Sequence, residues 1–335
     1  MTETAIRVAS SVADLLAGAT DVRPMKTGDS LSGCRFEHLY LDGEPHVVKY
    51  LCVDDDWIMR ASGDIHCRQG LLWRSELPSR LPSVIDHTVV GLAGYRTPTG
   101  RDGVALLMRD VGGYFVAEGS SSLPDEQHLH FIDHMAELHA SLWGWHDDIE
   151  LMSFGLMYTM LTPVTSAVEA GLAGTASVPP ALAPGWARLR TAAPRAADII
   201  MPLLADPGPL IEGLMQTPSS FLHGDWKLGN LGSHPDGRTI LVDWDRSCEG
   251  PPCFELAWYL AVNCDRMAMS KEAAIDAYRA SLERRGIDTG SWWQTQLALS
   301  LLGGLLMLGW SKTGGDPQEI GWWEDRTLEA ARYLP

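Results

Sequence analysis

The segment FLHGDWKLGN, residues 221–230, places an imidazole, a carboxylate, an ammonium and an amide within ten positions. These groups belong to His223, Asp225, Lys227 and Asn230, and two glycines lie among them. A stretch this short and this rich in glycine does not form a stable helix. We therefore expect a loop that gathers the four polar groups at one place.

A second carboxylate, Asp243, follows the hydrophobic residues of the segment TILVDW (239–244) and lies 18 positions after Asp225. A carboxylate and an amide oxygen that face each other across a turn can bind one divalent cation, and ligation by oxygen alone suits magnesium better than zinc. We expect Asn230 and Asp243 to be these ligands. Asp225 would lie beside the metal, where it could orient an attacking hydroxyl and accept its proton as a bond forms. This is the arrangement of a transferase.

The pattern HGDxxxxN, followed by a strand that ends in Asp and Trp, resembles the aminoglycoside phosphotransferase and choline kinase family. The members of this family are small-molecule kinases with a protein-kinase-like fold. The resemblance extends to EGPPCFELAWYL (249–260), in which Glu255 stands where Asp is usual. It also includes MAELHASLW (135–143) and ALLMRDV (105–111), which resembles the hinge between two lobes.

This resemblance implies a role for each matched residue. Asp225 is the expected catalytic base, His223 organises the loop backbone, and Asn230 and Asp243 bind Mg²⁺. The implied nucleotide is ATP, with GTP as an alternative. Lys227 lies inside the motif, where it could reach the γ-phosphate or equally remain a solvated loop lysine.

The nucleotide is expected against the first part of the chain. Lys49, in HVVKYL (46–51), lies where the family places the lysine that binds the α- and β-phosphates. The loop GDSLSG (28–33) could cover the phosphates with backbone N–H groups and serine hydroxyls. The residues that we expect around the nucleotide are Gly28, Ser30, Ser32, Gly33, Lys49, Gln69, Met108, Asp110 and Lys227.

The partner of Lys49 is a departure from the family pattern. Many relatives have a glutamate that pairs with this lysine, but the matching position in RQGLLWRSELPSRLP (68–82) is Gln69. A neutral amide holds a lysine less firmly than a carboxylate does. Glu76, seven positions further along and on the same face of a helix, is the alternative partner.

The length and the pattern of the chain predict two lobes. A chain of 335 residues exceeds the size at which a single core usually stops growing. The expected fold is α+β and protein-kinase-like. Residues 1–109 form a small nucleotide-binding lobe with an antiparallel sheet and one helix, and residues 110–335 form a larger, mainly helical lobe that binds the acceptor.

Within the first lobe, residues 34–52 predict a hairpin that turns at Asp42 and Gly43. A helix is expected from about residue 61 to residue 77, followed by strands at 84–97 and 104–108.

In the second lobe, apolar residues between 129 and 142 recur at helical spacing, which predicts an amphipathic helix. We expect His139 on this helix to be buried under the catalytic loop, and His128, His130 and His134 to form a solvated face. The apolar stretch 297–310 is too short to span a bilayer and predicts a buried helix.

Composition excludes several classes of partner. A net charge of −17 repels nucleic acids and anionic membranes, so neither is expected to bind. The six cysteines have neither the spacing of a zinc site nor that of a disulfide framework, and the first residues do not resemble a signal peptide. The sequence therefore predicts a cytoplasmic protein with reduced thiols, either a monomer or a homodimer.

The expected function is phosphorylation of a hydroxyl on a small molecule, such as an aminoglycoside-like antibiotic, an amino alcohol, a sugar or a related metabolite. The acidic composition suits a cationic acceptor. Tryptophans of the C-terminal part suit a flat or apolar acceptor instead, although core and helix packing is the simpler explanation for them; these are Trp292, Trp293, Trp310, Trp322 and Trp323. Two alternatives stay open: a kinase-like nucleotide-binding regulatory protein without turnover, and a nucleotidyl transferase.

Overall fold

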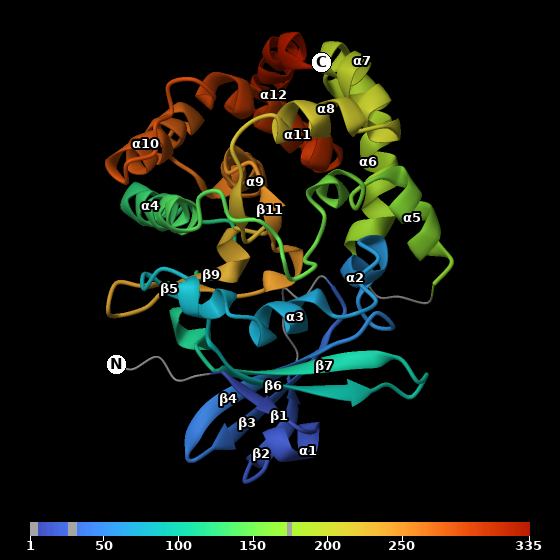
Figure 1. Ribbon diagram of the computed structural model, residues 1–335. Coiled ribbons are helices and arrows are strands. Elements are labelled where there is room, and N and C mark those ends of the chain that lie inside the picture. Colours follow the sequence, from blue (N-terminus) through green and yellow to red (C-terminus); the bar gives the residue numbers. More distant parts are fainter. Residues whose placement is uncertain (1–5, 26–31, 173–175) are drawn as a thin grey trace.

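The computed structural model describes residues 6–25, 32–172 and 176–335 (Figure 1). A sheet-rich lobe contains the beginning of the chain, and helices form most of the rest. The α+β class and the two-lobed architecture expected from the sequence are confirmed.

The N-terminal lobe is built on a six-stranded sheet with the strand order β1-β6-β7-β4-β3-β2. Neighbouring strands are antiparallel except for β1, which pairs in parallel with β6. The predicted hairpin is present: Asp42 and Gly43 both have positive φ, 53° and 83°, as a two-residue turn of this kind requires. The strands are β1 (Arg7–Ala9), β2 (Thr20–Met25), β3 (Arg35–Leu41), β4 (Glu44–Leu51), β6 (Val89–Arg96) and β7 (Asp102–Arg109).

The helix predicted over residues 61–77 is wrong in its bounds. Two short helices, α2 (Trp57–Ala61) and α3 (Arg68–Arg74), take its place, and a further short helix, α1 (Val12–Leu15), lies near the N-terminus. Gly63 and Cys67, which lie between α2 and α3, have φ values of 65° and 56°, and no continuous right-handed helix can contain such values. A 3-10 turn, η1 (Leu77–Arg80), follows α3.

The two lobes share elements. β7 ends at Arg109, the last residue of the lobe expected from the sequence, but the preceding β5 (Ile85–Asp86) pairs with β10 (Thr239–Leu241) of the helical lobe. β9 (Leu231–Ser233) completes that three-stranded sheet. Arg60 on α2 also forms an ion pair of 2.8 Å with Glu169 on α5 (Pro163–Ala170), which is a second contact between the lobes.

The C-terminal lobe is mainly helical. Its helices are α4 (Asp125–Ser141), α5 (Pro163–Ala170), α6 (Val178–Ala192), α7 (Pro194–Ala205), α8 (Gly208–Met215), α9 (Cys253–Val262), α10 (Lys271–Arg284), α11 (Trp293–Lys312) and α12 (Pro317–Ala330). The 3-10 turns are η2 (Gly112–Tyr114), η3 (Phe154–Tyr158), η4 (Leu228–Asn230), η5 (Trp244–Arg246), η6 (Cys264–Arg266) and η7 (Ala331–Tyr333). A two-stranded antiparallel sheet joins β8 (Ser220–Leu222) to β11 (Cys248–Gly250).

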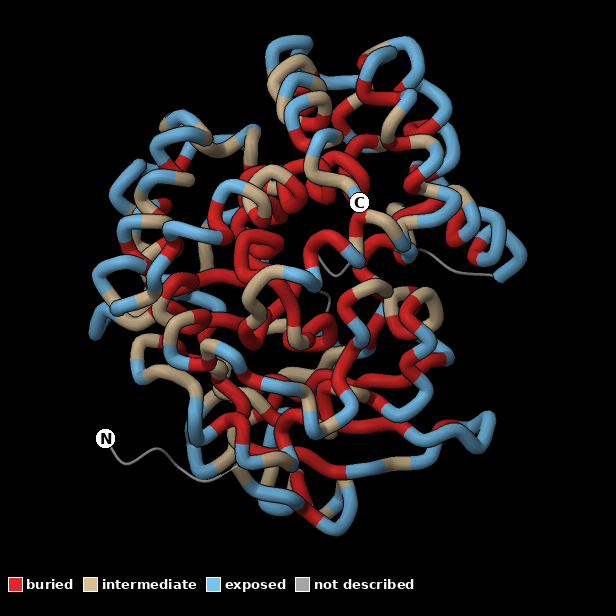
Figure 2. The backbone as a smooth tube through the Cα atoms, turned by 45° about the horizontal axis from the view of Figure 1, so that its top comes forward, coloured by how far each residue is buried: buried red, intermediate tan, exposed pale blue. Residues whose placement is uncertain are grey.

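The core of this lobe lies around α9 and α11, which are buried along most of their length (Figure 2). α11 contains the apolar stretch 297–310, so the predicted buried helix is confirmed. None of the helices in the described residues combines the length and the hydrophobicity needed to cross a membrane.

Helix α4 confirms one prediction and corrects another. His139 is fully buried, as expected. The solvated face predicted for the other histidines is wrong, because His128 and His134 are buried. His128 shares a hydrogen bond of 2.6 Å with the hydroxyl of Tyr259 on α9, and His134 one of 2.8 Å with the hydroxyl of Thr239 on β10. Contacts from distant segments, which helical spacing does not reveal, cover this face.

Candidate active site

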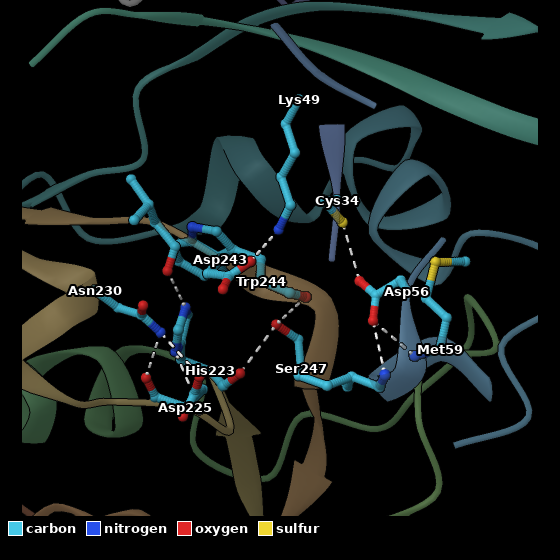
Figure 3. A network of polar contacts seen from close by, with 12 residues as sticks. Cys34, Lys49, Asp56, Met59, His223, Asp225, Asn230, Asp243, Trp244 and Ser247 are labelled. Carbon is cyan, nitrogen blue, oxygen red and sulfur yellow. Dashed lines mark hydrogen bonds and ion pairs between the residues drawn. The ribbon is translucent and has the colours of Figure 1, made fainter. Parts of the chain in front are cut away.

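His223 fixes the loop that follows β8. Its ring is buried, and burial lowers its pKa. Nδ1 lies 3.2 Å from the backbone nitrogen of Asp225 and accepts its N–H, so Nε2 carries the proton and donates to the carbonyl of Val242 at 3.0 Å. These bonds define a neutral tautomer. The side chain thus joins the loop to the end of β10 (Figure 3).

Gly224 lets the loop pass close to the segment after Asp243. Its φ is +83°, and a Cβ at this position would lie 2.2 Å from the carbonyl oxygen of Arg246. Residues with a side chain rarely adopt this φ, and the contact with backbone leaves no room for a methyl group. The glycine of the HGD motif is therefore a steric requirement.

Glu255 on α9 binds the backbone of the loop that contains His223 and Gly224. Its fully buried carboxylate accepts hydrogen bonds from the backbone N–H groups of His223, at 3.2 Å, and Gly224. Nε2 of His139 lies 2.9 Å from the same carboxylate, and Nδ1 of His139 lies 2.6 Å from the hydroxyl of Tyr278. The side chain of Glu255 therefore reaches from α9 to the backbone of the loop.

Asp225 lies at the centre of the site. Its carboxylate is buried and is bracketed by Lys227, with Nζ at 2.9 Å, and by Arg246, with Nη1 at 3.1 Å. Asn230 donates from Nδ2 to the backbone oxygen of Asp225 at 2.9 Å and to its Oδ2 at 3.0 Å. Burial alone would raise the pKa of Asp225, but the charges of Lys227 and Arg246 lower it to about 2. The group is therefore a carboxylate at neutral pH.

Asp243 faces this loop from the turn after β10. Its φ is +71°, a left-handed conformation that Asp tolerates better than most residues with a side chain. Its carboxylate forms an ion pair with Lys49 on β4 (Figure 3). Burial would raise the pKa of Asp243, but Lys49 and Lys227 hold it below its usual range. The expected phosphate-binding lysine and the expected metal ligand thus lie in direct contact.

Asp245 lies next to the candidate site but was not among the residues expected there from the sequence. It is buried two positions after Asp243, and both of its carboxylate oxygens lack a hydrogen-bond partner among the described residues. Burial and the nearby charge of Asp243 raise its pKa well above the usual range. The spacing Asp-Trp-Asp in residues 243–245 was the available signal, but a strand pattern alone does not say that both carboxylates are buried.

Gln69 contacts the turn that contains Asp243. With its amide oriented so that the oxygen faces them, it accepts hydrogen bonds from the backbone N–H groups of Asp245 at 3.0 Å and of Trp244 at 3.2 Å. Glu76 lies beyond the end of α3 and is exposed. Lys49 forms its ion pair with Asp243. In the described part of the chain, neither Gln69 nor Glu76, the two partners expected from the sequence, pairs with this lysine.

The expected phosphate loop is described only in part. Gly28 and Ser30 lie outside the described residues. Ser32 is buried, and its carbonyl accepts the N–H of Trp57 at 3.2 Å. Gly33 has a φ of +99°, and a Cβ there would lie 2.5 Å from the carbonyl oxygen of Asp55, so this end of the loop packs on the start of α2.

The expected hinge residues lie where β7 leaves the sheet. Met108 is on β7 and pairs with Val47 of β4 and Val89 of β6. Asp110 follows the strand, and its Oδ1 accepts the N–H of Gly112 at 2.9 Å.

A cavity of about 720 Å³ lies next to the loop of residues 223–230, with Asp225, Lys227 and Asn230 in its wall. Arg246 and Trp258 also line it. Arg246, which lies between two acidic residues in the sequence, was not among the residues expected at the site.

Comparison with known proteins gives a family. The family model described as "Phosphotransferase enzyme family" matches residues 76–289. No curated protein matches the chain in sequence.

The chain is similar in structure to solved phosphotransferases. A microcompartment-associated aminopropanol kinase has a TM-score of 0.50 and 15% sequence identity, and the match covers 94% of this chain and 92% of that one. The amicoumacin kinase hAmiN, in complex with AMP-PNP, Ca²⁺ and Ami, has a TM-score of 0.50 and 10% identity, with 98% and 89% covered. An aminoglycoside phosphotransferase from Streptomyces rimosus, in complex with ADP and streptomycin, has a TM-score of 0.49 and 16% identity, with 88% and 96% covered.

The family model spans most of the chain, including the loop of residues 223–230, the turn of Asp243 and helix α9. The family resemblance expected from the sequence is therefore confirmed. The chain is a phosphotransferase and belongs to the phosphotransferase enzyme family.

Proposed function

We propose that this phosphotransferase moves the γ-phosphoryl group of ATP, or of GTP, to a hydroxyl of a small molecule with the help of Mg²⁺. The observation that carries the proposal is the meeting of Lys49, Asp225, Asn230 and Asp243, which come from both lobes, around one point. The fold shared with a kinase solved with AMP-PNP supports a nucleotide in this place.

The residues present fit a divalent cation. Asn230 directs its Nδ2 to Asp225, which leaves its Oδ1 as the atom for a cation. Asp243 supplies a carboxylate, and the unpartnered carboxylate of Asp245 lies two residues further on. Asn230 and Asp243 would hold Mg²⁺, with Asp245 beside them. When bound, the ion would neutralise the charge of the phosphates.

Asp225 would hold the acceptor's hydroxyl. Because its pKa is about 2, the carboxylate accepts a hydrogen bond from the hydroxyl but takes its proton only late, as the new O–P bond forms and the bond to the leaving nucleoside diphosphate breaks. Positioning is therefore the larger part of its role. Lys227, 2.9 Å away, keeps the carboxylate ionised.

Lys49 would exchange partners when the nucleotide binds. In the structure its ammonium pairs with Asp243, and the charge of Asp243 raises the pKa of Lys49 against the effect of burial. Phosphate oxygens offer the ammonium an alternative anion. The exchange would release the carboxylate of Asp243 for the cation.

The test is the mass of the product. The protein is incubated with MgATP and with a panel of hydroxyl compounds: an amino alcohol, as suggested by the aminopropanol kinase, streptomycin as a polycationic compound, and neutral aromatic alcohols. A product that gains one phosphoryl group supports the proposal, and a gain of one nucleotidyl group contradicts it. Asp225→Asn should abolish the product, whereas Asp236→Asn, in the exposed turn between β9 and β10, should retain it.

A further inference from the structure

The cavity beside Asp225 combines polar residues with an apolar and aromatic surface. Its side walls come from α9, from α11 and from the loop before α5, and α2 of the N-terminal lobe closes one side. Trp258 and Trp310 present indole rings to it, and Met160 and Leu161 add buried apolar surface. A cavity with such walls suits a flat or apolar body.

The carboxylates deep in this cavity are already paired. Asp225 is bracketed by Lys227 and Arg246, as described above. Glu319 pairs with Lys312 at 3.1 Å and with Lys271.

The other carboxylates that line the cavity, Glu118, Asp265 and Asp316, are exposed. An acceptor with several ammonium groups would therefore have to compete with lysine and arginine for the inner carboxylates. The acidic composition of the whole chain does not extend to the inner part of this cavity.

Several hydrogen-bond donors of the residues that line the cavity, by contrast, have no partner among the described residues. Nε1 of Trp258, Nε1 of Trp310 and Nε of Arg246 are buried and have no hydrogen-bond partner within the described ranges. All three residues line the cavity. Arg246 is also held in place, because its guanidinium lies 4.2 Å from the centroid of the Trp258 ring and donates to Asp225. Buried donors without partners favour a ligand that brings oxygen acceptors.

We propose that the acceptor is an uncharged or anionic hydroxyl compound with a flat apolar body and a hydrogen-bond-accepting oxygen near the reacting hydroxyl. Trp258 and Trp310 bind the apolar body with their rings, and the guanidinium of Arg246 together with the indole N–H groups donates to the oxygen. This inference rests on the proposed function, because it takes the cavity beside Asp225 to be the acceptor site. It selects between the cationic and the apolar acceptors that the sequence left open.

Three matched probes test it: 4-(hydroxymethyl)benzoate, 4-(hydroxymethyl)benzamide and 4-(hydroxymethyl)benzylamine. They share a ring and a hydroxyl and differ in charge and in the presence of an oxygen acceptor. Each is titrated into the full chain with Mg²⁺ and AMP-PNP present, and binding is followed by ligand-observed NMR; streptomycin serves as the polycationic probe. The benzoate and the benzamide should bind at least tenfold more tightly than the amine or streptomycin.

Two variants locate the binding. Arg246→Gln removes the guanidinium, and Trp310→Phe keeps a ring but removes the indole N–H. Each should weaken binding of the benzoate and the benzamide by at least fivefold. Trp322→Phe is the matched control, because its Nε1 donates to Glu272 at 2.6 Å and it is not among the residues that line the cavity. Trp310→Phe keeps the test decisive if Arg246→Gln does not fold.

Nucleotide binding is measured separately on each protein, which distinguishes the two proposals. If the wild type binds Mg²⁺ and AMP-PNP but binds the amine or streptomycin as tightly as the benzoate, or binds none of the probes, the acceptor proposal is overturned. The same holds if Trp322→Phe weakens binding as much as Trp310→Phe does. If the wild type does not bind the nucleotide at all, the proposed function is overturned instead.

Discussion

Replacing Glu255 tests how helix α9 fixes the backbone of the loop of residues 223–230. The carboxylate accepts three buried N–H groups, from the backbone of His223 and of Gly224 and from the ring of His139. Glu255→Ala leaves all three without a partner, at a cost of about 1–3 kcal/mol each. Because groups of one network do not add independently, we expect a total of about 3–5 kcal/mol. This is a large part of the roughly 5–15 kcal/mol that stabilises a typical domain.

Glu255→Gln is the milder variant. It keeps one acceptor oxygen but turns the other into a donor that faces an N–H group, so we expect a loss of about 1–3 kcal/mol. Turnover should fall more steeply than stability, because displacement of His223 and Gly224 moves Asp225. The assay is urea unfolding followed by tryptophan fluorescence, together with the turnover of folded protein.

The matched control is Glu249→Gln on β11. Glu249 also accepts a backbone hydrogen bond, from Asp147 at 3.0 Å, but its side chain is 22% exposed and does not contact the catalytic loop in any described bond. Its replacement should change stability little and turnover not at all. If Glu255→Gln matched this control in both measurements, the reasoning about the loop would be refuted.

Three further predictions concern neighbouring residues. The pKa of about 2 at Asp225 lies below that of an unfolded aspartate, so its charge stabilises the fold at neutral pH and this contribution is lost as the pH falls from about 5 to about 2; Asp225→Asn should flatten that part of the unfolding free energy against pH. Gly224→Ala should destabilise the protein more than Gly237→Ala in urea unfolding, because both glycines have positive φ but only the first Cβ would meet backbone. Gln69→Glu should keep activity, since a carboxylate still accepts the two N–H groups of the Asp243 turn, whereas Gln69→Leu should lose it in the product assay.

The sequence predicted the parts of the fold that local chemistry decides. The hairpin at Asp42 and Gly43 follows from two residue types that tolerate positive φ, and the buried helix α11 follows from a long apolar run. The gathering of Asp225, Asn230 and Asp243 in one place follows from a short glycine-containing loop before a strand.

Contacts between distant segments decided the rest. Cys67 adopts positive φ although its residue type gives no reason to expect this, so the break between α2 and α3 was not foreseen. Helical spacing predicted His128 to be a surface residue, but Tyr259 covers it in the structure. Gln69 was expected beside Lys49, but its partner is the turn of Asp243, and Arg246, for which no role was predicted, pairs with the carboxylate of Asp225.

The central claim is a nucleotide site that depends on a cation held by Asp243, and a thermal shift tests it most directly. ATP is added with Mg²⁺ or with a chelator to the wild type, to Asp243→Asn and to the control Asp236→Asn. A ligand at 100 times its Kd stabilises by about 2.7 kcal/mol, and each kcal/mol raises Tm by roughly 2–4 °C in a chain of this size. We expect a magnesium-dependent rise of several degrees in the Tm of the wild type and the control, and its loss in Asp243→Asn. A rise that is equal in all three proteins, or that is independent of Mg²⁺, would contradict it.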